Sequence, residues 1–180
     1  MACIDLRDRD CLVVGAGRVA TEKVHGLLDC DANVTVVAPE VDDELAALPV
    51  HVVRRPFSRS DVVGRFLVIA ATSDRSVNAD VSSAARERET LCNVADDPEL
   101  CSFILPAILR RDPIVVGVST GGASPALAQR IRSDVAGIIG PEHAEAARRL
   151  EALRPWAKQE FATYEERRDY FQQLVAEMLA

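Results

Sequence analysis

The stretch Cys11-Leu-Val-Val-Gly-Ala-Gly-Arg-Val-Ala20 decides the fold, because an apolar run enters a glycine turn and then a helical pattern. Four apolar residues without alternation are typical of a parallel strand that is buried on both faces. The residues that follow recur at helical spacing and indicate one apolar helix face: Ala20, Val24, Leu27 and Leu28. The sequence therefore predicts a strand, a tight turn and a helix in direct succession.

The glycine spacing in this stretch is that of a dinucleotide-binding turn. Gly15 permits a tight turn, Gly17 lets the backbone approach a pyrophosphate, and Ala20 is small enough for close packing of helix on strand. The free N–H groups at the start of the helix would point at phosphate oxygens. Such a turn alone is a weak signal, but a second apolar strand, Val34–Ala38, follows the helix. We therefore predict a βαβ unit that binds a dinucleotide.

The end of that second strand departs from the usual dinucleotide pattern. An acidic residue is expected there, about 20 residues beyond the glycines, to hold the ribose hydroxyls. This chain has Ala38-Pro39-Glu40 instead. Glu40 either reaches the ribose or is a solvated loop charge, and the sequence leaves both readings open. No arginine follows the strand directly, which favours NAD over NADP.

Length and composition bound the class of protein. The 180 residues carry a net charge of −7, which argues against a nucleic-acid partner. No apolar run approaches the ~20 residues of a membrane span, so no membrane contact is expected. Three scattered histidines and five cysteines without a CxxC spacing predict no preformed metal site. The odd cysteine number and the lack of a signal pattern favour a cytoplasmic protein, with Cys11 and Cys92 as small core residues.

Apolar runs and helical patterns alternate as far as about Val94, which is the signature of an α/β protein with a doubly wound, Rossmann-like parallel sheet. The predicted strands are Cys11–Val14, Val34–Ala38, His51–Val53, Phe66–Ala71 and Thr90–Val94, and the predicted helices are Val19–Leu28 and Ser76–Arg88. Ligands of such sheets lie outside the carboxyl ends of the strands. Thr72 and Asn93 are therefore candidate cofactor contacts, although Asn93 equally fits a side chain that satisfies buried backbone groups.

The pattern changes after Cys101. Two β-rich runs, Ser102–Leu109 and Ile114–Ser119, predict either a hairpin or an extension of the sheet. Ser124 is placed to cap a helix over Ala126–Ile139. Pro125 then stands at the first helical position, where it is well tolerated.

Two further helices are predicted at about Glu142–Leu153 and Trp156–Leu179. The second of them carries five of the eight aromatic residues of the chain. A helical tail of this size is too small to bury the rings alone, so we expect it to pack on the sheet domain, a second subunit or a large flat ligand. Of these, a packing or dimer surface is favoured.

Five motifs follow one another in a fixed order: Leu12-Val-Val-Gly-Ala-Gly-Arg-Val-Ala-Thr-Glu-Lys23, Ile69-Ala-Ala-Thr-Ser-Asp74, Cys92-Asn-Val-Ala-Asp96, Ser102-Phe-Ile-Leu-Pro106 and Val118-Ser-Thr-Gly-Gly-Ala-Ser-Pro125. Together they resemble the precorrin-2 dehydrogenase family, which also forms the N-terminal module of siroheme synthase. The resemblance implies an NAD-binding domain over residues 1–105, a dimerisation segment over 106–139 and a helical C-terminal segment over 140–180.

The resemblance also implies an activity. Members of this family oxidise precorrin-2 to sirohydrochlorin with NAD, in the synthesis of siroheme or a related modified tetrapyrrole, and they form homodimers. Some members also insert Fe²⁺ into the product, which is a lyase activity. Asp96 matches the aspartate that is the proposed catalytic residue of the family. A carboxylate at the mouth of the sheet is well placed as a general base, although Asp96 also fits a turn residue ahead of Pro98, and Asp97 competes for either role.

Other family positions are carried over residue by residue. Four residues fall on NAD-contacting positions: Arg18, Val19, Pro39 and Glu40. Four more form a loop that resembles the rim of the active site, or alternatively a helix-capping turn: Ser119, Thr120, Gly121 and Gly122. Because precorrin-2 carries many carboxylates, four arginines are candidates for binding them or for surface and dimer contacts: Arg110, Arg111, Arg130 and Arg132.

A second function class shares the glycine turn and the sheet. An NAD-sensing regulatory module would bind the nucleotide without tetrapyrrole chemistry. Such modules rely on an acidic residue that closes the second strand, which this chain lacks, and they have no need of the Ser119–Pro125 loop. These two features favour the enzyme.

Overall fold

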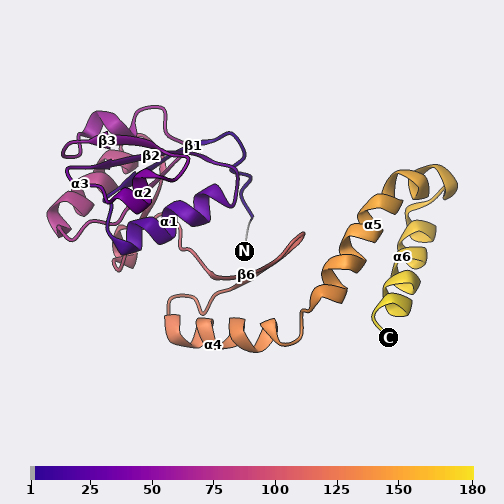
Figure 1. The fold of residues 1–180 in the computed structure, drawn as a ribbon. Helices are drawn as coiled ribbons and strands as arrows, with labels where there is room; N and C mark the ends of the chain where they lie inside the picture. The colour runs from indigo at the N-terminus through magenta and orange to yellow at the C-terminus, as the bar shows by residue number, and fades with distance from the viewer. Residues whose placement is uncertain (1–2) are drawn as a thin grey trace. The chain divides into compact units, whose positions relative to one another are not determined.

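The computed structural model describes residues 3–180, which form two compact units. The first unit ends at Leu105 and the second is Pro106–Ala180. Figure 1 shows the first as a sheet with flanking helices, and the second as a hairpin followed by three helices.

The first unit is built on a five-stranded parallel sheet in the order β3-β2-β1-β4-β5. Its strands are β1 (Asp10–Val14), β2 (Asn33–Ala38), β3 (His51–Arg54), β4 (Leu67–Ala70) and β5 (Leu91–Val94). The helices between them are α1 (Arg18–Leu28), α2 (Asp43–Ala46) and α3 (Arg75–Arg86), with 3₁₀ turns at Arg59–Val62 and Pro98–Leu100. Each predicted strand and helix of this unit is present with small shifts at its ends, so the predicted doubly wound sheet is confirmed.

Strand β1 is buried on both faces because its side chains alternate between two cores. Cys11 and Val13 lie in one core with the apolar face of α1, whereas Leu12 and Val14 lie in the other with α3. The burial of Cys11 confirms it as a core residue, as does that of Cys92 in β5. Burial also raises the pKa of both thiols to about 11, because it disfavours the thiolate.

The predicted strand Ser102–Leu109 is wrong in its first half. Ser102 N donates to Cys92 O over 2.8 Å, and Ser102 Oγ accepts from Cys92 N over 2.8 Å. These bonds hold the segment against β5, so that it completes the first unit instead of starting the hairpin. The strand begins only at Ala107, in the second unit.

The second unit opens with an antiparallel hairpin of β6 (Ala107–Arg111) and β7 (Ile114–Val118), separate from the five-stranded sheet. The hairpin interpretation is therefore confirmed and the extension of the sheet is wrong. Helix α4 (Pro125–Ala136) packs on both strands of the hairpin. Ser124 Oγ accepts from Leu127 N over 3.2 Å and Pro125 is the first helical residue, as predicted.

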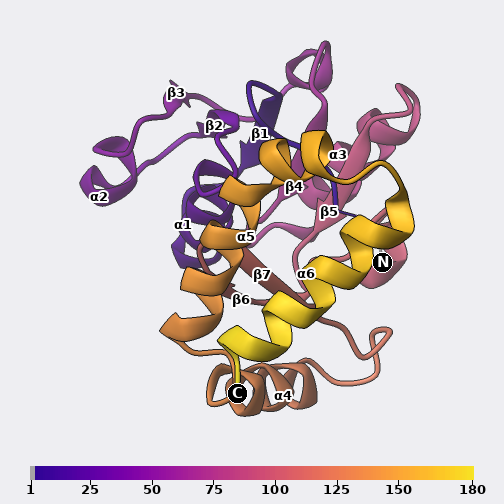
Figure 2. The same cartoon turned by 90° about the vertical axis from the view of Figure 1, so that its right-hand side faces the viewer.

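The boundaries predicted for the last two helices are wrong. Helix α5 (Pro141–Glu160) continues through Pro155, and α6 (Tyr164–Met178) begins after a short break. A proline inside a helix removes one backbone hydrogen bond, but Ala157, two residues later, is fully buried and holds the helix in place. The break is set instead by Thr163, which caps α6 in a reciprocal pair of bonds with Glu166. The helices lie side by side in Figures 1 and 2.

Candidate functional site

The strand order points to the carboxyl ends of β1 and β4 as the place where a ligand would bind. The chain leaves β1 toward β2 and β3 on one side, then crosses to β4 and β5 on the other. Connections that depart in opposite directions leave an opening between these two strand ends, which is where doubly wound sheets bind ligands. The Gly15–Ala20 turn follows β1, and Thr72 lies just beyond the end of β4.

Gly15 is required by the backbone of the neighbouring strand. Its φ of +108° lies in a region that side chains disfavour. A Cβ at this position would lie 2.5 Å from Ala71 O and 2.8 Å from Ala71 C. The absence of a side chain therefore lets β1 turn directly over the end of β4.

Gly17 differs from Gly15, because the protein itself does not need a glycine there. Its φ of −79° and ψ of −179° suit any residue, and a Cβ would meet nothing within 4 Å. Gly17 is the N-cap of α1, without a side-chain cap, and the first turn of the helix carries no acidic residue. Unpaired N–H groups at an open helix start without acidic residues fit a pyrophosphate.

The flanking residues predicted to contact NAD occupy different environments. Arg18 is exposed and pairs with Glu22 at 3.4 Å, while Val19 is half-buried. Pro39 and Glu40 are both exposed just after β2. Within residues 3–180 no hydrogen bond or ion pair engages the Glu40 carboxylate, so it is available to a ribose but not held toward one.

Thr72 is held by a residue that the sequence reasoning missed. Asn78, buried in the first half of α3, accepts from Thr72 N over 3.2 Å and from Thr72 Oγ1 over 2.8 Å through its Oδ1, and donates to Thr72 O over 3.0 Å. Asp74 caps the same helix by accepting from Ser76 N. An asparagine on an otherwise apolar helix face was the available signal for this clamp.

Asn93 satisfies a buried backbone group, which is one of the two roles that the sequence leaves open for it. Its side chain is 7 % exposed, and Nδ2 donates to Phe103 O over 3.0 Å. The amide thus satisfies the backbone of the segment that follows β5. Contact of Asn93 with the cofactor stays a prediction.

Asp96 and Asp97, which follow β5, are distinguished by their partners. Asp97 Oδ2 accepts from Arg75 over 3.1 Å. Asp96 is exposed, and no hydrogen bond or ion pair engages its side chain among the described residues. Its φ of +60° is the left-handed region that aspartate tolerates. Of the two carboxylates, only Asp97 has a side-chain partner among the described residues.

Cys101 fixes the loop that carries Asp96, which the sequence did not reveal. Its Sγ accepts from Val94 N over 3.1 Å, and lies 3.3 Å from both Val94 O and Asp97 O, where the thiol hydrogen finds an acceptor. The turn from Val94 to Asp97 is thus held from inside by one thiol.

The Ser119–Gly122 loop lies in the second unit and bonds to itself. Ser119 Oγ accepts from Gly121 N over 3.2 Å. Thr120 Oγ1 accepts from Ser124 N and donates to Ser124 O, both over 3.1 Å. Gly121 and Gly122 have φ of +64° and +88°. These contacts form the helix-capping turn, and contact of the loop with a substrate stays a prediction.

The arginines predicted as candidates for binding substrate carboxylates have different environments. Arg130 pairs with Asp134 at 2.9 Å, and Arg111 donates to the backbone of Arg110. Arg132 has a buried Nε without a hydrogen-bond partner among the described residues. Over the same range, no group of His, Cys, Asp and Glu side chains suited to a metal ion is found, and no helix is long and apolar enough to span a membrane.

Comparison with known proteins relates both units to tetrapyrrole synthesis. Residues 111–137 match the family described as sirohaem biosynthesis protein central. Siroheme synthase of Thioalkalivibrio sulfidiphilus is 44 % identical over 174 residues, which are 94 % of this chain and 36 % of that protein. Siroheme synthase of Escherichia coli is 42 % identical over 94 % of this chain and 38 % of its own length. The chain thus spans little more than a third of these curated relatives.

A solved structure, titled SirC, precorrin-2 dehydrogenase, superposes with a TM-score of 0.83 at 26 % identity and covers 99 % of this chain and 90 % of its own. Residues 2–107 match a family described as putative NAD(P)-binding, a span that holds the whole five-stranded sheet and both glycines of the turn. The chain therefore belongs to this NAD(P)-binding family.

Proposed function

We propose that this protein oxidises precorrin-2 to sirohydrochlorin with NAD as the oxidant, in the synthesis of siroheme or a related modified tetrapyrrole. The observation that carries the proposal is the likeness to a precorrin-2 dehydrogenase over 99 % of the chain, second unit included. The siroheme synthase relatives, which match over 94 % of the chain, support the same pathway. An NAD-sensing module would need only the first unit.

The reaction removes a hydride and a proton from the substrate. NAD⁺, when bound at the Gly15–Ala20 turn, supplies the hydride acceptor. We assign the proton to Asp96, because its carboxylate is exposed and unpaired whereas Asp97 is held by Arg75. Cys101 keeps the Asp96 loop in place. Thr72 and Asn93 then act mainly by shaping the strand ends that surround the cofactor.

Iron insertion would use the same carboxylate. Chelation removes two pyrrole N–H protons, which Asp96 is able to accept in turn. Fe²⁺ would then be a substrate that meets the macrocycle and not a resident ion.

The decisive experiment supplies precorrin-2 and NAD⁺ to the purified chain and follows NADH and the sirohydrochlorin spectrum under anaerobic conditions. Asp96→Asn should retain NAD affinity and lose turnover by roughly 10²–10⁴-fold, the usual contribution of a general base. Asp97→Asn is the matched control and should keep most of the activity. Wild-type turnover in Asp96→Asn would disprove the assignment. NAD binding without turnover in the wild type would favour the sensing module.

A second arm adds Fe²⁺ to supplied sirohydrochlorin. Metallation faster than in a protein-free control would establish a ferrochelatase, and an equal rate would leave a dehydrogenase only.

We propose that the protein is a cytoplasmic homodimer formed through the second unit. Val115 on the hairpin and Leu127 on α4 are each more than half exposed. Arg132, also on α4, has the unpartnered Nε that a second subunit would satisfy. Light scattering should show a dimer that Leu127→Glu converts to a monomer, whereas Val63→Glu, at an even more exposed apolar site in the first unit, should not. A wild-type monomer would refute this.

A further inference from the structure

A pocket of about 520 Å³ lies between α5 and α6 in the second unit. Its volume is in the range of small-molecule sites. Side chains from both helices line it, and six of them give it its character: Arg154, Lys158, Tyr164, Arg167, Arg168 and Phe171. None of these residues has a part in the reaction proposed above.

Most basic residues of the two helices line the pocket, whereas their acidic residues lie on the remaining surface. Residues 141–180 contain eight acidic and six basic residues. Four of the six basic residues line the pocket, and no acidic residue does. A net negative segment therefore presents a pocket whose charged lining residues are all basic, which favours anions.

Two of the pocket cations have no partner. No hydrogen bond or ion pair engages Arg154 or Lys158 in the part of the chain that the structure describes, although they stand four residues apart on α5. Like charges at this spacing destabilise a helix. By contrast, Arg148 on the same helix pairs with Glu145 at 3.0 Å. An anion in the pocket would relieve the repulsion that the protein leaves uncompensated.

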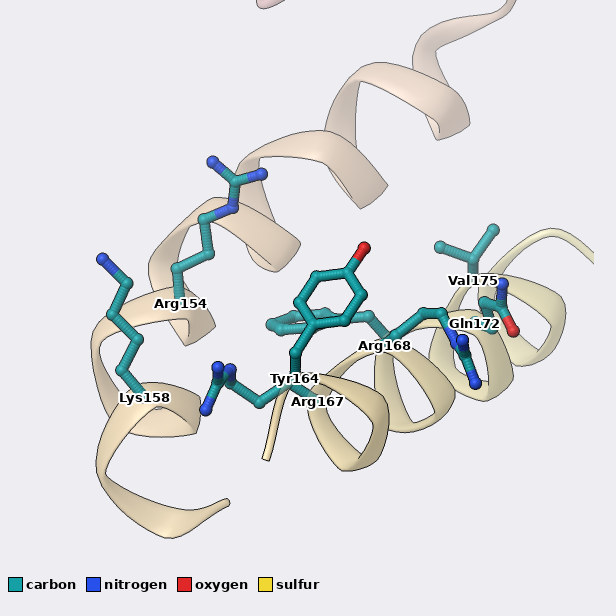
Figure 3. Close-up of a pocket in the computed structure, with 8 residues that line it drawn as sticks. Arg154, Lys158, Tyr164, Arg167, Arg168, Gln172 and Val175 are labelled. Carbon is teal, nitrogen blue, oxygen red and sulfur yellow. The ribbon is translucent and has the colours of Figure 1, made fainter. Parts of the chain in front are cut away.

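The remaining two cations also line the pocket, and each has a bond to another group of the chain. Arg167 donates to Phe161 O over 2.9 Å, and Arg168 pairs with the adjacent Asp169 at 2.6 Å. Figure 3 shows Arg154, Lys158 and Arg167 on one side of the Tyr164 ring, and Arg168 on the other. Donors therefore stand on both sides of one ring.

Tyr164 supplies an aromatic surface that is largely exposed. The neighbouring rings of Trp156, Phe161 and Tyr170 pack together, with centroids 5.1–5.8 Å apart. Phe171 joins this cluster through Tyr170 and is half-buried. Tyr164 stays outside the cluster and is 67 % exposed. An exposed ring among cations suits a ligand that is flat and apolar in the middle and anionic at its edges.

We propose that the α5–α6 pocket is a binding site for a flat aromatic polycarboxylate. The ring system would lie against Tyr164 and Phe171, and the peripheral carboxylates would accept hydrogen bonds from the four cations. Guanidinium groups match carboxylates with two parallel bonds, whereas a lone inorganic anion would leave the ring uncovered.

The test uses uroporphyrin, an octacarboxylate whose fluorescence reports binding, with the full chain. Lys158→Glu should weaken binding by roughly tenfold or more, since it replaces an attraction with a repulsion. Arg149→Glu is the matched control: the same helix and charge change, but outside the pocket, with little expected effect. Tyr164→Ala, at an exposed position, should also weaken binding and guards against misfolding of the charge variant. The octamethyl ester of the porphyrin should bind poorly.

Two results would overturn the proposal. The first is an equal loss in Lys158→Glu and Arg149→Glu, which would mean a general charge effect. The second is undiminished binding in Lys158→Glu, which would mean that the porphyrin binds elsewhere. If that variant also changes its oligomeric state, a second copy of the chain occupies the pocket. Porphyrin binding is measured without NAD or turnover, and porphyrin bound only at the substrate site of the proposed reaction would not respond to Lys158→Glu, so the two proposals fail separately.

Discussion

The two glycines of the turn should respond to alanine in opposite ways. Gly15→Ala forces a side chain into positive φ, which costs roughly 1–2 kcal/mol. Its methyl group also meets Ala71 O at 2.5 Å, and such overpacking costs roughly 1–3 kcal/mol. The free energy of unfolding should therefore fall by about 2–5 kcal/mol, a large part of the ~5–15 kcal/mol of a typical domain.

Gly17→Ala is the matched variant two residues away. Its backbone angles suit alanine and its Cβ is unobstructed. The loss of unfolded-state freedom and the poorer capping by alanine nearly offset each other, so the stability should change by less than about 1 kcal/mol. NAD affinity should nevertheless fall by at least roughly tenfold, because the methyl group occupies the path of the pyrophosphate.

Urea denaturation followed by circular dichroism measures the first effect, and isothermal titration with NAD⁺ measures the second. Equal stability of the two variants would refute the close-approach reasoning at Gly15. Unchanged NAD affinity in Gly17→Ala would show that the pyrophosphate lies elsewhere.

Three further outcomes follow from buried or paired groups. The Arg55 guanidinium binds Asp61 through two hydrogen bonds and lowers the pKa of that carboxyl, so Asp61→Asn should destabilise the protein at neutral pH. The stability difference between the two proteins should fade as the pH falls from about 4 through the lowered pKa. A pH-independent difference in urea titrations would contradict this. Asn78→Ala should cost about 1–3 kcal/mol, because it leaves Thr72 N–H without an acceptor; unchanged thermal stability would show that water replaces the amide. The Cys11 thiol should resist iodoacetamide until urea is added, as peptide mass mapping would show, since burial raises its pKa to about 11; rapid labelling of the native protein would refute its burial.

Local patterns predicted the first unit well because its elements carry their own signals. The apolar run of β1, the glycine spacing and the face of α1 each point to the same βαβ unit. The boundaries failed where long-range contacts decide. The segment after Cys101 resembles a strand, but Ser102 ties it to Cys92 of β5. At Pro155 the packing of the buried Ala157 overrides the usual helix-breaking effect. The spacing of Thr163 and Glu166 is that of a capping box, which indicates the start of α6.

For the candidate site, the sequence predicted positions but not the partners of their side chains. Strand-end reasoning identified Thr72 and Asn93, but a sequence does not show that their side chains are committed to Asn78 and Phe103 O. The family resemblance singled out Asp96, and only the partners of Asp97 distinguish the two carboxylates. The role of Cys101 was not predictable, since nothing in the neighbouring sequence indicates that its thiol faces the inside of a turn.

The fit of Gly15 against Ala71 also determines which residue of β1 occupies which place. Strands with one polar face are aligned by that face, because a slip of one residue would bury charges. Residues 11–14 are apolar on both faces, so much of this discrimination is lost. A slip in either direction, however, would bring Val14 or Ala16 to the site of Gly15, and each has a Cβ where only hydrogen fits. One missing side chain thus acts as the alignment mark for the central strand.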